Sequence, residues 1–224
     1  MNRIRTLDVG KKVAVVEPGV VNNTLREKVE TLGLFCCPDP ASLLVSTIGG
    51  NIAEGAGGPR TALHGTTRDY VVGLEIVLAD GTVLTTGVLS AHPIDWDAGP
   101  LIVASEGTLA IVTAAALRLS ERPESHETFR ADFASLEEAA ATVARITASG
   151  LPVSVLELLD RDTYVCACRY VRGEAPDPAP DGSLLIELEG DEVQVRSSSE
   201  RLARLLSDSG ATGLRRAADE RERD

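Results

Sequence analysis

A cluster of glycines is the feature that most restricts how this 224-residue chain can fold. Five glycines fall between residues 49 and 58, among an asparagine and small alanines. So much glycine weakens a helix and leaves a strand few side chains to pack. The bare backbone lets a ligand approach closely, and its N–H groups can donate to a phosphate or to the polar edge of a cofactor ring. Tight turns at a sheet edge are the commoner cause of such clusters, so composition leaves both interpretations open.

A β-rich segment follows the glycines. Residues 71–78 are mostly aliphatic, with Glu75 inside the run, which predicts a strand. Asp80-Gly81 supplies a turn, and residues 83–86 predict the returning strand of a hairpin.

Charge and hydrophobicity limit the possible partners. With 43% hydrophobic residues the chain can bury a substantial core, while its net charge of −12 argues against nucleic acid or an anionic membrane as a partner. No apolar run approaches the roughly 18 residues of a membrane span, and residues 1–5 are not followed by a signal-peptide core. We therefore expect a cytoplasmic protein without a transmembrane segment.

The cysteines and histidines do not have the spacing of a metal site. Cys36-Cys37 and Cys166-x-Cys168 lack the separation that zinc knuckles and iron–sulfur clusters need, so we predict structural or incidental thiols, because free cysteine usually behaves as a small hydrophobic residue. His64 has no His or Cys partner at ligand spacing, which predicts a surface or loop histidine and no metal. Arg68 and Asp69, at the start of a predicted strand, are expected to form an ion pair that braces the glycine segment.

Hydrophobic periodicity divides the remaining chain into two parts around a linker at residues 122–124. In the first part we expect a strand, turn and strand over 4–17, a helix over 24–32 capped by Asn22 or Asn23, and one helical turn over 42–46. In the second part we expect strands over 129–133, 153–159 and 183–189 and helices over 136–149, 162–171 and 192–209. Strands separated by helices in this order predict an α+β layer with helices on one face.

Six short motifs occur in a fixed order along the chain. They are PDP-x-S from Pro38, T-x-GGN-x-A from Thr47, AGGPR from Ala56, HG-x-TRDYV-x-GLE from His64, DG-x-V from Asp80 and SEGTL from Ser105. This order and spacing resemble the FAD-linked oxidases of the vanillyl-alcohol oxidase type, which carry a PCMH-type FAD-binding domain. Within that family, the resemblance is strongest to the FAD-carrying subunit of glycolate oxidase and to D-lactate dehydrogenases.

The resemblance implies an α+β fold. Residues 1–121 are expected to form the second subdomain of a PCMH-type FAD-binding domain, and residues 122–224 the start of an α+β cap domain. The resemblance covers nearly all of this chain but only about half the length of a full family member. A first glycine loop and the cap histidines of the family have no counterpart here, so no catalytic base is assigned. Ala104 and Ala110 stand where the family usually has glycine.

The resemblance also implies which residues contact FAD, largely through their main chain. These are Pro38, Asp39, Ser42, Ser46, Thr47, Gly49, Gly50, Asn51, Gly55, Ala56, Gly57, Glu106, Gly107, Thr108 and Ile111.

Two functions follow from the resemblance. The first is an oxidoreductase in which FAD accepts a hydride from the α-carbon of a small D-2-hydroxy acid. The alternative is a non-catalytic remnant or split subunit that binds FAD weakly or only with a partner chain. Core surface left uncovered by the unmatched family segments predicts a partner subunit or a homo-oligomer.

Overall fold

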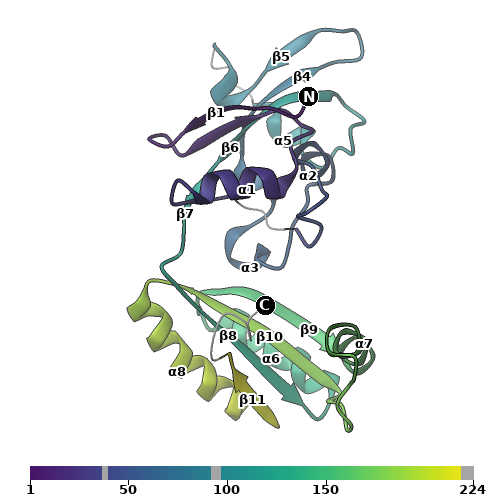
Figure 1. The fold of residues 1–224 in the computed structure, drawn as a ribbon, viewed down its shortest axis with the longest axis vertical. Coiled ribbons are helices and arrows are strands. Elements are labelled where there is room, and N and C mark those ends of the chain that lie inside the picture. Colours follow the sequence, from purple (N-terminus) through teal and green to yellow (C-terminus); the bar gives the residue numbers. More distant parts are fainter. Residues whose placement is uncertain (37–39, 92–96, 218–224) are drawn as a thin grey trace. The chain divides into compact units, whose positions relative to one another are not determined.

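The computed structural model of this chain describes residues 1–36, 40–91 and 97–217. It divides into two compact units, Met1–Arg122 and Pro123–Asp224 (Figure 1). Each unit has its own sheet and its own hydrophobic core.

The first unit is built on a five-stranded antiparallel sheet with the strand order β1-β2-β6-β4-β5. Side chains of α1 and α2 pack with this sheet in one core, and β3 pairs separately with β7. The elements are β1 (Ile4–Asp8), β2 (Val13–Val16), α1 (Asn22–Glu30), β3 (Leu34–Phe35), α2 (Ile48–Glu54), α3 (Thr61–His64), α4 (Thr67–Tyr70), β4 (Val71–Val77), β5 (Val83–Thr85), a 3-10 turn (Gly87–Leu89), α5 (Gly99–Ile102), β6 (Ile111–Arg118) and β7 (Ser120–Glu121).

The second unit is a four-stranded antiparallel sheet with the strand order β11-β8-β10-β9. Because β10 lies between β8 and β9, the chain makes a split β-α-β arrangement. The elements are β8 (Ser125–Phe133), α6 (Leu136–Ala148), β9 (Val153–Asp160), α7 (Arg161–Arg172), β10 (Gly182–Gly190), α8 (Glu192–Asp208) and β11 (Gly213–Arg216).

Two of the three helices of this unit cover one face of its sheet. Ile146 of α6 and Leu202 of α8 are buried in one cluster with Phe129 and Ala131 of β8. The third helix, α7, differs from the prediction that all helices share one face. Its buried Tyr164 lies against Arg130, which points away from that cluster because successive strand residues alternate between faces.

Most of the longer predicted elements are confirmed. The strand pair over 4–17, the hairpin over 71–86 and the three strands and three helices after residue 124 are present, and Ser135 caps α6 as predicted. The predicted cap of α1 is wrong. Val21 is its N-cap residue, and the Asn22 side chain instead turns inward to bond other polar groups.

A buried carboxylate ties the edge of the first sheet together. The Glu17 side chain is 3% exposed and pairs with the Arg3 guanidinium at 2.8 Å and with Arg5 at 3.4 Å. Glu17 also accepts the Arg3 backbone N–H at 3.0 Å, and Arg5 reaches Glu75 of β4 at 3.3 Å. The side-chain hydrogen bond from Arg3, followed by its backbone bond, lowers the pKa of Glu17 to about 2.

We predict that Glu17→Gln destabilises the first unit in a pH-dependent way. The folded-state pKa of about 2 lies below the ordinary value of 4.5. The ionised carboxylate therefore stabilises the fold above pH 4.5, and this contribution disappears as the pH falls towards 2. Urea unfolding at several pH values should show a lower midpoint for Glu17→Gln at neutral pH and a difference that shrinks on acidification.

The exposed Glu192, whose partner Arg196 is 3.8 Å away on the same helix, gives a control. Glu192→Gln should leave the midpoint nearly unchanged at every pH. A midpoint difference for Glu17→Gln that stays constant down to acidic pH would contradict the role assigned to this carboxylate.

Candidate functional site

The glycine segment begins as a helix, contrary to the expectation that glycine would prevent one. Gly49 and Gly50 lie in the first turn of α2. Oγ1 of Thr47 accepts the N–H of Gly50 at 3.2 Å and so caps the helix, which ends at Gly55 in the left-handed conformation, with φ 64°. Strong signals at both ends thus compensate for two poor helix formers.

Two of these glycines are needed because the chain packs closely on itself. A Cβ on Gly49 would lie 2.6 Å from the Cβ of Pro18, and one on Gly55 would lie 2.7 Å from the Cβ of Ala104. Both distances are too short for real side chains. Close packing within the protein therefore accounts for Gly49 and Gly55 without a ligand.

The end of α2 is bonded to a segment that is distant in sequence. The Ala104 N–H donates to the Ile52 carbonyl at 2.9 Å, and the Glu106 N–H donates to the Ala53 carbonyl at 2.8 Å. To make these bonds, Ala104 and Glu106 adopt φ values of 68° and 51°, which are unusual for residues with a side chain. The SEGTL motif is thereby fixed beside the glycine helix.

Arg68 holds the same segment from its other side. Its guanidinium donates to the Pro100 carbonyl at 2.8 Å and the Val103 carbonyl at 3.1 Å, at the end of α5. The predicted ion pair with Asp69 is wrong. The Asp69 carboxylate instead accepts the Thr66 N–H at 2.7 Å in a capping box for α4, so Arg68 is left to bond carbonyl groups.

A cavity of about 260 Å³ opens where α2, α5 and the start of β6 meet. Its lining residues are Pro18, Gly49, Ile52, Ala53, Ile102, Ser105, Gly107, Ala110, Ile111 and Val112. The wall is mostly apolar, and Ile111 at its edge is 64% exposed. Within the described part of the chain, the buried hydroxyl of Ser105 has no hydrogen-bond partner. A mostly apolar wall with few polar groups is typical of a site for an organic ligand.

The predicted cofactor residues fall into three groups. Gly49, Gly107 and Ile111 line the cavity. The Asn51 side chain is buried and donates to Asn22, which in turn donates to Ser46, so these polar groups already satisfy one another. The third group does not line the cavity. Thr47, Gly50, Gly55, Ala56 and Gly57 lie in or next to α2, Glu106 and Thr108 lie in the SEGTL motif, and Ser42 lies in a turn over residues 41–45. Pro38 and Asp39 are outside the described residues.

Sequence reasoning missed Ser105 as a site residue. It opens the SEGTL motif, so the signal was present, but only the fold shows that its hydroxyl is buried in an apolar cavity. Ala110 lines the same cavity, where its methyl group takes up space that the glycine usual in the family would leave open.

The thiols differ from one another in burial, and His64 differs in part from its prediction. Cys36 is buried, Cys166 is exposed on α7, and Cys37 lies outside the described residues. His64 ends the short helix α3, half-buried, with its ring 5.8 Å from that of Phe35. Among the residues that the structure describes, no group of three or more His, Cys, Asp or Glu is placed to bind a metal ion. No helix over those residues combines the length and hydropathy required to cross a bilayer.

Comparison with known proteins decides the family. A family model described as an FAD binding domain matches residues 1–87, and one described as the C-terminal domain of FAD linked oxidases matches residues 122–224. The chain belongs to the FAD-linked oxidases. FAD is the cofactor of this family.

Relatives of this FAD-linked oxidase extend over nearly the whole chain. It is 39% identical over 223 residues to glycolate oxidase subunit GlcD of Bacillus subtilis. The aligned region is 99% of this chain and 47% of that protein. It is 32% identical over 212 residues to a probable mitochondrial D-lactate dehydrogenase of Danio rerio, covering 93% of this chain and 42% of that protein. The chain thus spans about half the length of these curated relatives.

Solved structures share the fold at lower identity. Alkyldihydroxyacetonephosphate synthase superposes with a TM-score of 0.80 at 22% identity, over 100% of this chain and 46% of that protein. Substrate-bound p-cresol methylhydroxylase superposes with a TM-score of 0.73 at 17% identity, over 96% of this chain and 47% of that protein. These likenesses establish the fold of this FAD-linked oxidase.

The two alanines that replace family glycines should respond in opposite ways to Ala→Gly. Ala104→Gly removes a side chain from a residue with φ 68° and should stabilise the first unit by about 1 kcal/mol. Ala110 is 8% exposed and has no such backbone strain, so Ala110→Gly should destabilise it by about 1 kcal/mol through lost packing and greater chain entropy. Chemical denaturation of both variants measures the difference, and equal shifts would contradict the strain assigned to residue 104.

Proposed function

We propose that this chain is part of an FAD-dependent oxidoreductase that oxidises a small D-2-hydroxy acid by hydride transfer to the flavin. The observation that carries the proposal is the mostly apolar cavity between α2 and the SEGTL motif, which Ser105 lines. The hydroxyl oxygen of Ser105 is buried beside it without a hydrogen-bond partner among the described residues. The names of the two relatives, a glycolate oxidase subunit and a probable D-lactate dehydrogenase, support this substrate class. They do not favour the alternative of a non-catalytic remnant.

We also propose a role for each unit. Residues 1–121 serve as a partial FAD-binding domain and residues 122–224 as a partial cap domain, in agreement with the two family models. GlcD is named as a subunit, which supports a partner chain for this protein as well. The cytoplasm remains the predicted location.

The bound FAD would supply the redox chemistry by accepting the hydride. The protein's own residues would bind the cofactor and shield it from water. The side chains of Ile52, Ile102 and Ile111 provide an apolar wall that excludes water from one side of the site. Ser105 would help to hold the cofactor through its hydroxyl, because a buried hydroxyl without a partner has a free-energy cost that a hydrogen bond to a ligand would remove.

The hydrogen bonds from the Ala104 and Glu106 N–H groups to α2 fix the backbone that surrounds this site. The carbonyls of Ile52 and Ala53 hold the backbone around Ser105, and Arg68 fixes the preceding turn. We propose that the predicted main-chain contacts of the glycine segment and of the SEGTL motif are made to FAD along this edge. We name no catalytic base, since neither His64 nor His126 lines the cavity.

The test of the function is an absorbance spectrum of the purified protein mixed with FAD and then desalted. We expect a retained flavin spectrum that bleaches under anaerobic conditions when D-lactate or glycolate is added, because hydride transfer reduces the flavin. L-Lactate is the matched control and should leave the spectrum oxidised. Retained flavin that neither D-lactate nor glycolate bleaches would contradict the proposed reaction for this chain.

The site itself is tested by Ser105→Ala. Removing the hydroxyl should weaken FAD binding roughly fivefold to tenfold, the loss expected for one hydrogen bond, while the denaturation midpoint stays the same or rises. Ser120→Ala, on β7 and outside the cavity lining, is the control and should bind FAD as the unaltered protein does. Fluorescence quenching of FAD gives the affinities. Equal affinities for Ser105→Ala and the unaltered protein would contradict the assignment of this cavity.

A further inference from the structure

A second cavity, wholly within the second unit, collects arginines from three different elements. It measures about 330 Å³ and contains Arg130 of β8, Arg172 at the end of α7 and Arg215 of β11. We call it the arginine groove. Its remaining lining residues are Asp132, Tyr164, Cys168, Glu174, Ala175, Pro176, Pro178 and Pro180.

Arg130 is held in place at the base of this groove. Its guanidinium lies 5.4 Å from the centre of the Tyr164 ring and pairs with Asp132 at 2.9 Å. Asp132 is fixed in turn, because it accepts the Ser183 hydroxyl at 2.8 Å. Burial raises the pKa of Tyr164, so its ring stays neutral under Arg130. A cation fixed on both sides loses little entropy when an anion binds.

Several arginine N–H groups of the groove have no hydrogen-bond acceptor or ion-pair partner within the described part of the protein. The Nε of Arg130 is buried and lacks a hydrogen-bond acceptor among the described residues. Arg172 and Arg215 are exposed, and neither forms an ion pair with any described residue. Their guanidinium groups are therefore free to bind a ligand from solution.

The charge of the groove opposes that of the whole protein. Three arginines face two carboxylates, Asp132 and Glu174, and Asp132 is already engaged by Arg130 and Ser183. The chain as a whole carries a net charge of −12. An excess of positive charge in one groove attracts a negative ligand there, although the protein as a whole is acidic.

We propose that the arginine groove binds a small oxyanion, a carboxylate or a phosphoryl group, separately from the flavin site of the first unit. Arg172 and Arg215 donate to its oxygens from two sides, and Arg130 supplies fixed positive charge beneath it. A planar guanidinium matches the two oxygens of a carboxylate or phosphate better than a lysine would. The three prolines give that side of the groove a restrained backbone. The volume lies at the small end of the range for ligand pockets, which limits the ligand to a metabolite-sized anion.

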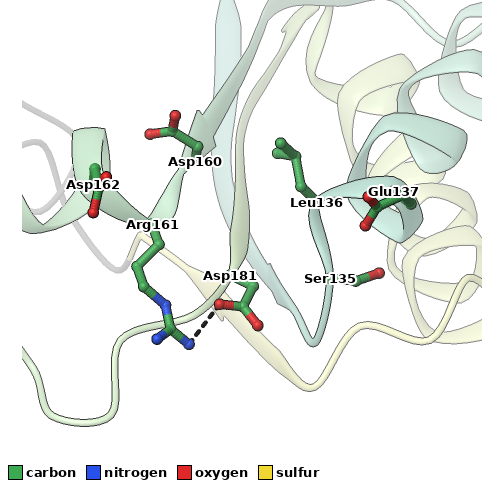
Figure 2. Close-up of a pocket in the computed structure, with 7 residues that line it drawn as sticks. All are labelled: Ser135, Leu136, Glu137, Asp160, Arg161, Asp162 and Asp181. Carbon is green, nitrogen blue, oxygen red and sulfur yellow. Dashed lines mark ion pairs between the residues drawn. The ribbon is translucent and has the colours of Figure 1, made fainter.

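A neighbouring groove of the same unit shows the contrast (Figure 2). It measures about 370 Å³, but its one arginine, Arg161, is paired with Asp181 at 2.5 Å. Asp160 there accepts the Thr163 N–H at 2.8 Å and caps α7. With its only cation neutralised and further carboxylates around it, this groove repels anions, so Arg161 serves as an internal control.

The experiment is isothermal titration calorimetry of the full chain at constant ionic strength, with inorganic phosphate and malonate titrated separately. We expect saturable binding of at least one of the two anions at one site per chain. Tighter binding of phosphate would indicate a phosphoryl ligand, and tighter binding of malonate would indicate a carboxylate ligand. The double variant Arg172→Gln/Arg215→Gln should bind at least roughly tenfold more weakly, because two charged hydrogen-bond donors are lost. Both positions are exposed, so thermal unfolding should confirm that the variant folds normally.

Arg161→Gln should bind the same anion with unchanged affinity. Absence of saturable binding by both anions would overturn the proposal. So would equal affinities in the double variant and the unaltered protein, since the heat would then come from non-specific charge screening. Arg130→Gln gives an independent test. At a temperature where thermal unfolding shows this variant to be folded, we expect it to bind the anion more weakly than the unaltered protein.

Discussion

The contact between α2 and the SEGTL segment is the interaction on which the candidate flavin site depends. Two carbonyls at the end of a short helix receive two N–H groups from a distant loop, at 2.9 and 2.8 Å. The contact requires a residue without a side chain at Gly55, because a Cβ there would meet Ala104. It also forces Ala104 and Glu106 into left-handed backbone conformations. The cavity that Ser105 lines lies next to these two residues.

Both units have arginine–carboxylate pairs at their sheets, with a buried carboxylate in the first unit and a half-buried pair in the second, and the consequences differ. In the first unit, Glu17 is satisfied by Arg3 and Arg5, and the cluster stabilises the edge of the sheet without a free donor at its centre. In the second unit, Arg130 is oriented by Asp132 but keeps a donor unused. The first cluster is structural, whereas the second orients Arg130 beside a groove whose exposed arginines, Arg172 and Arg215, are available to a ligand.

Elements with a clear hydrophobic period were predictable from the sequence, and short or alanine-rich ones were not. The hairpin over 71–86 and the helix α8 follow from their apolar spacing. The central strand β6 was missed because its middle is three alanines, which favour strands weakly but fit where neighbouring strands leave no exposed surface. The edge strand β11 was missed because it is exposed and has no alternating pattern.

The sequence by itself determined the family, because motif order and spacing are properties of the chain: PDP-x-S, T-x-GGN-x-A and SEGTL can be found without coordinates. It also determined the cofactor class and two α+β segments. Only the tertiary structure decided what each motif residue does. Asn51 became a buried partner of Asn22, Arg68 a brace for carbonyl groups, and Ser105 an unsatisfied hydroxyl in a cavity. The reason is physical: hydrogen bonding and burial depend on residues far apart in the chain, and local sequence does not encode their distance.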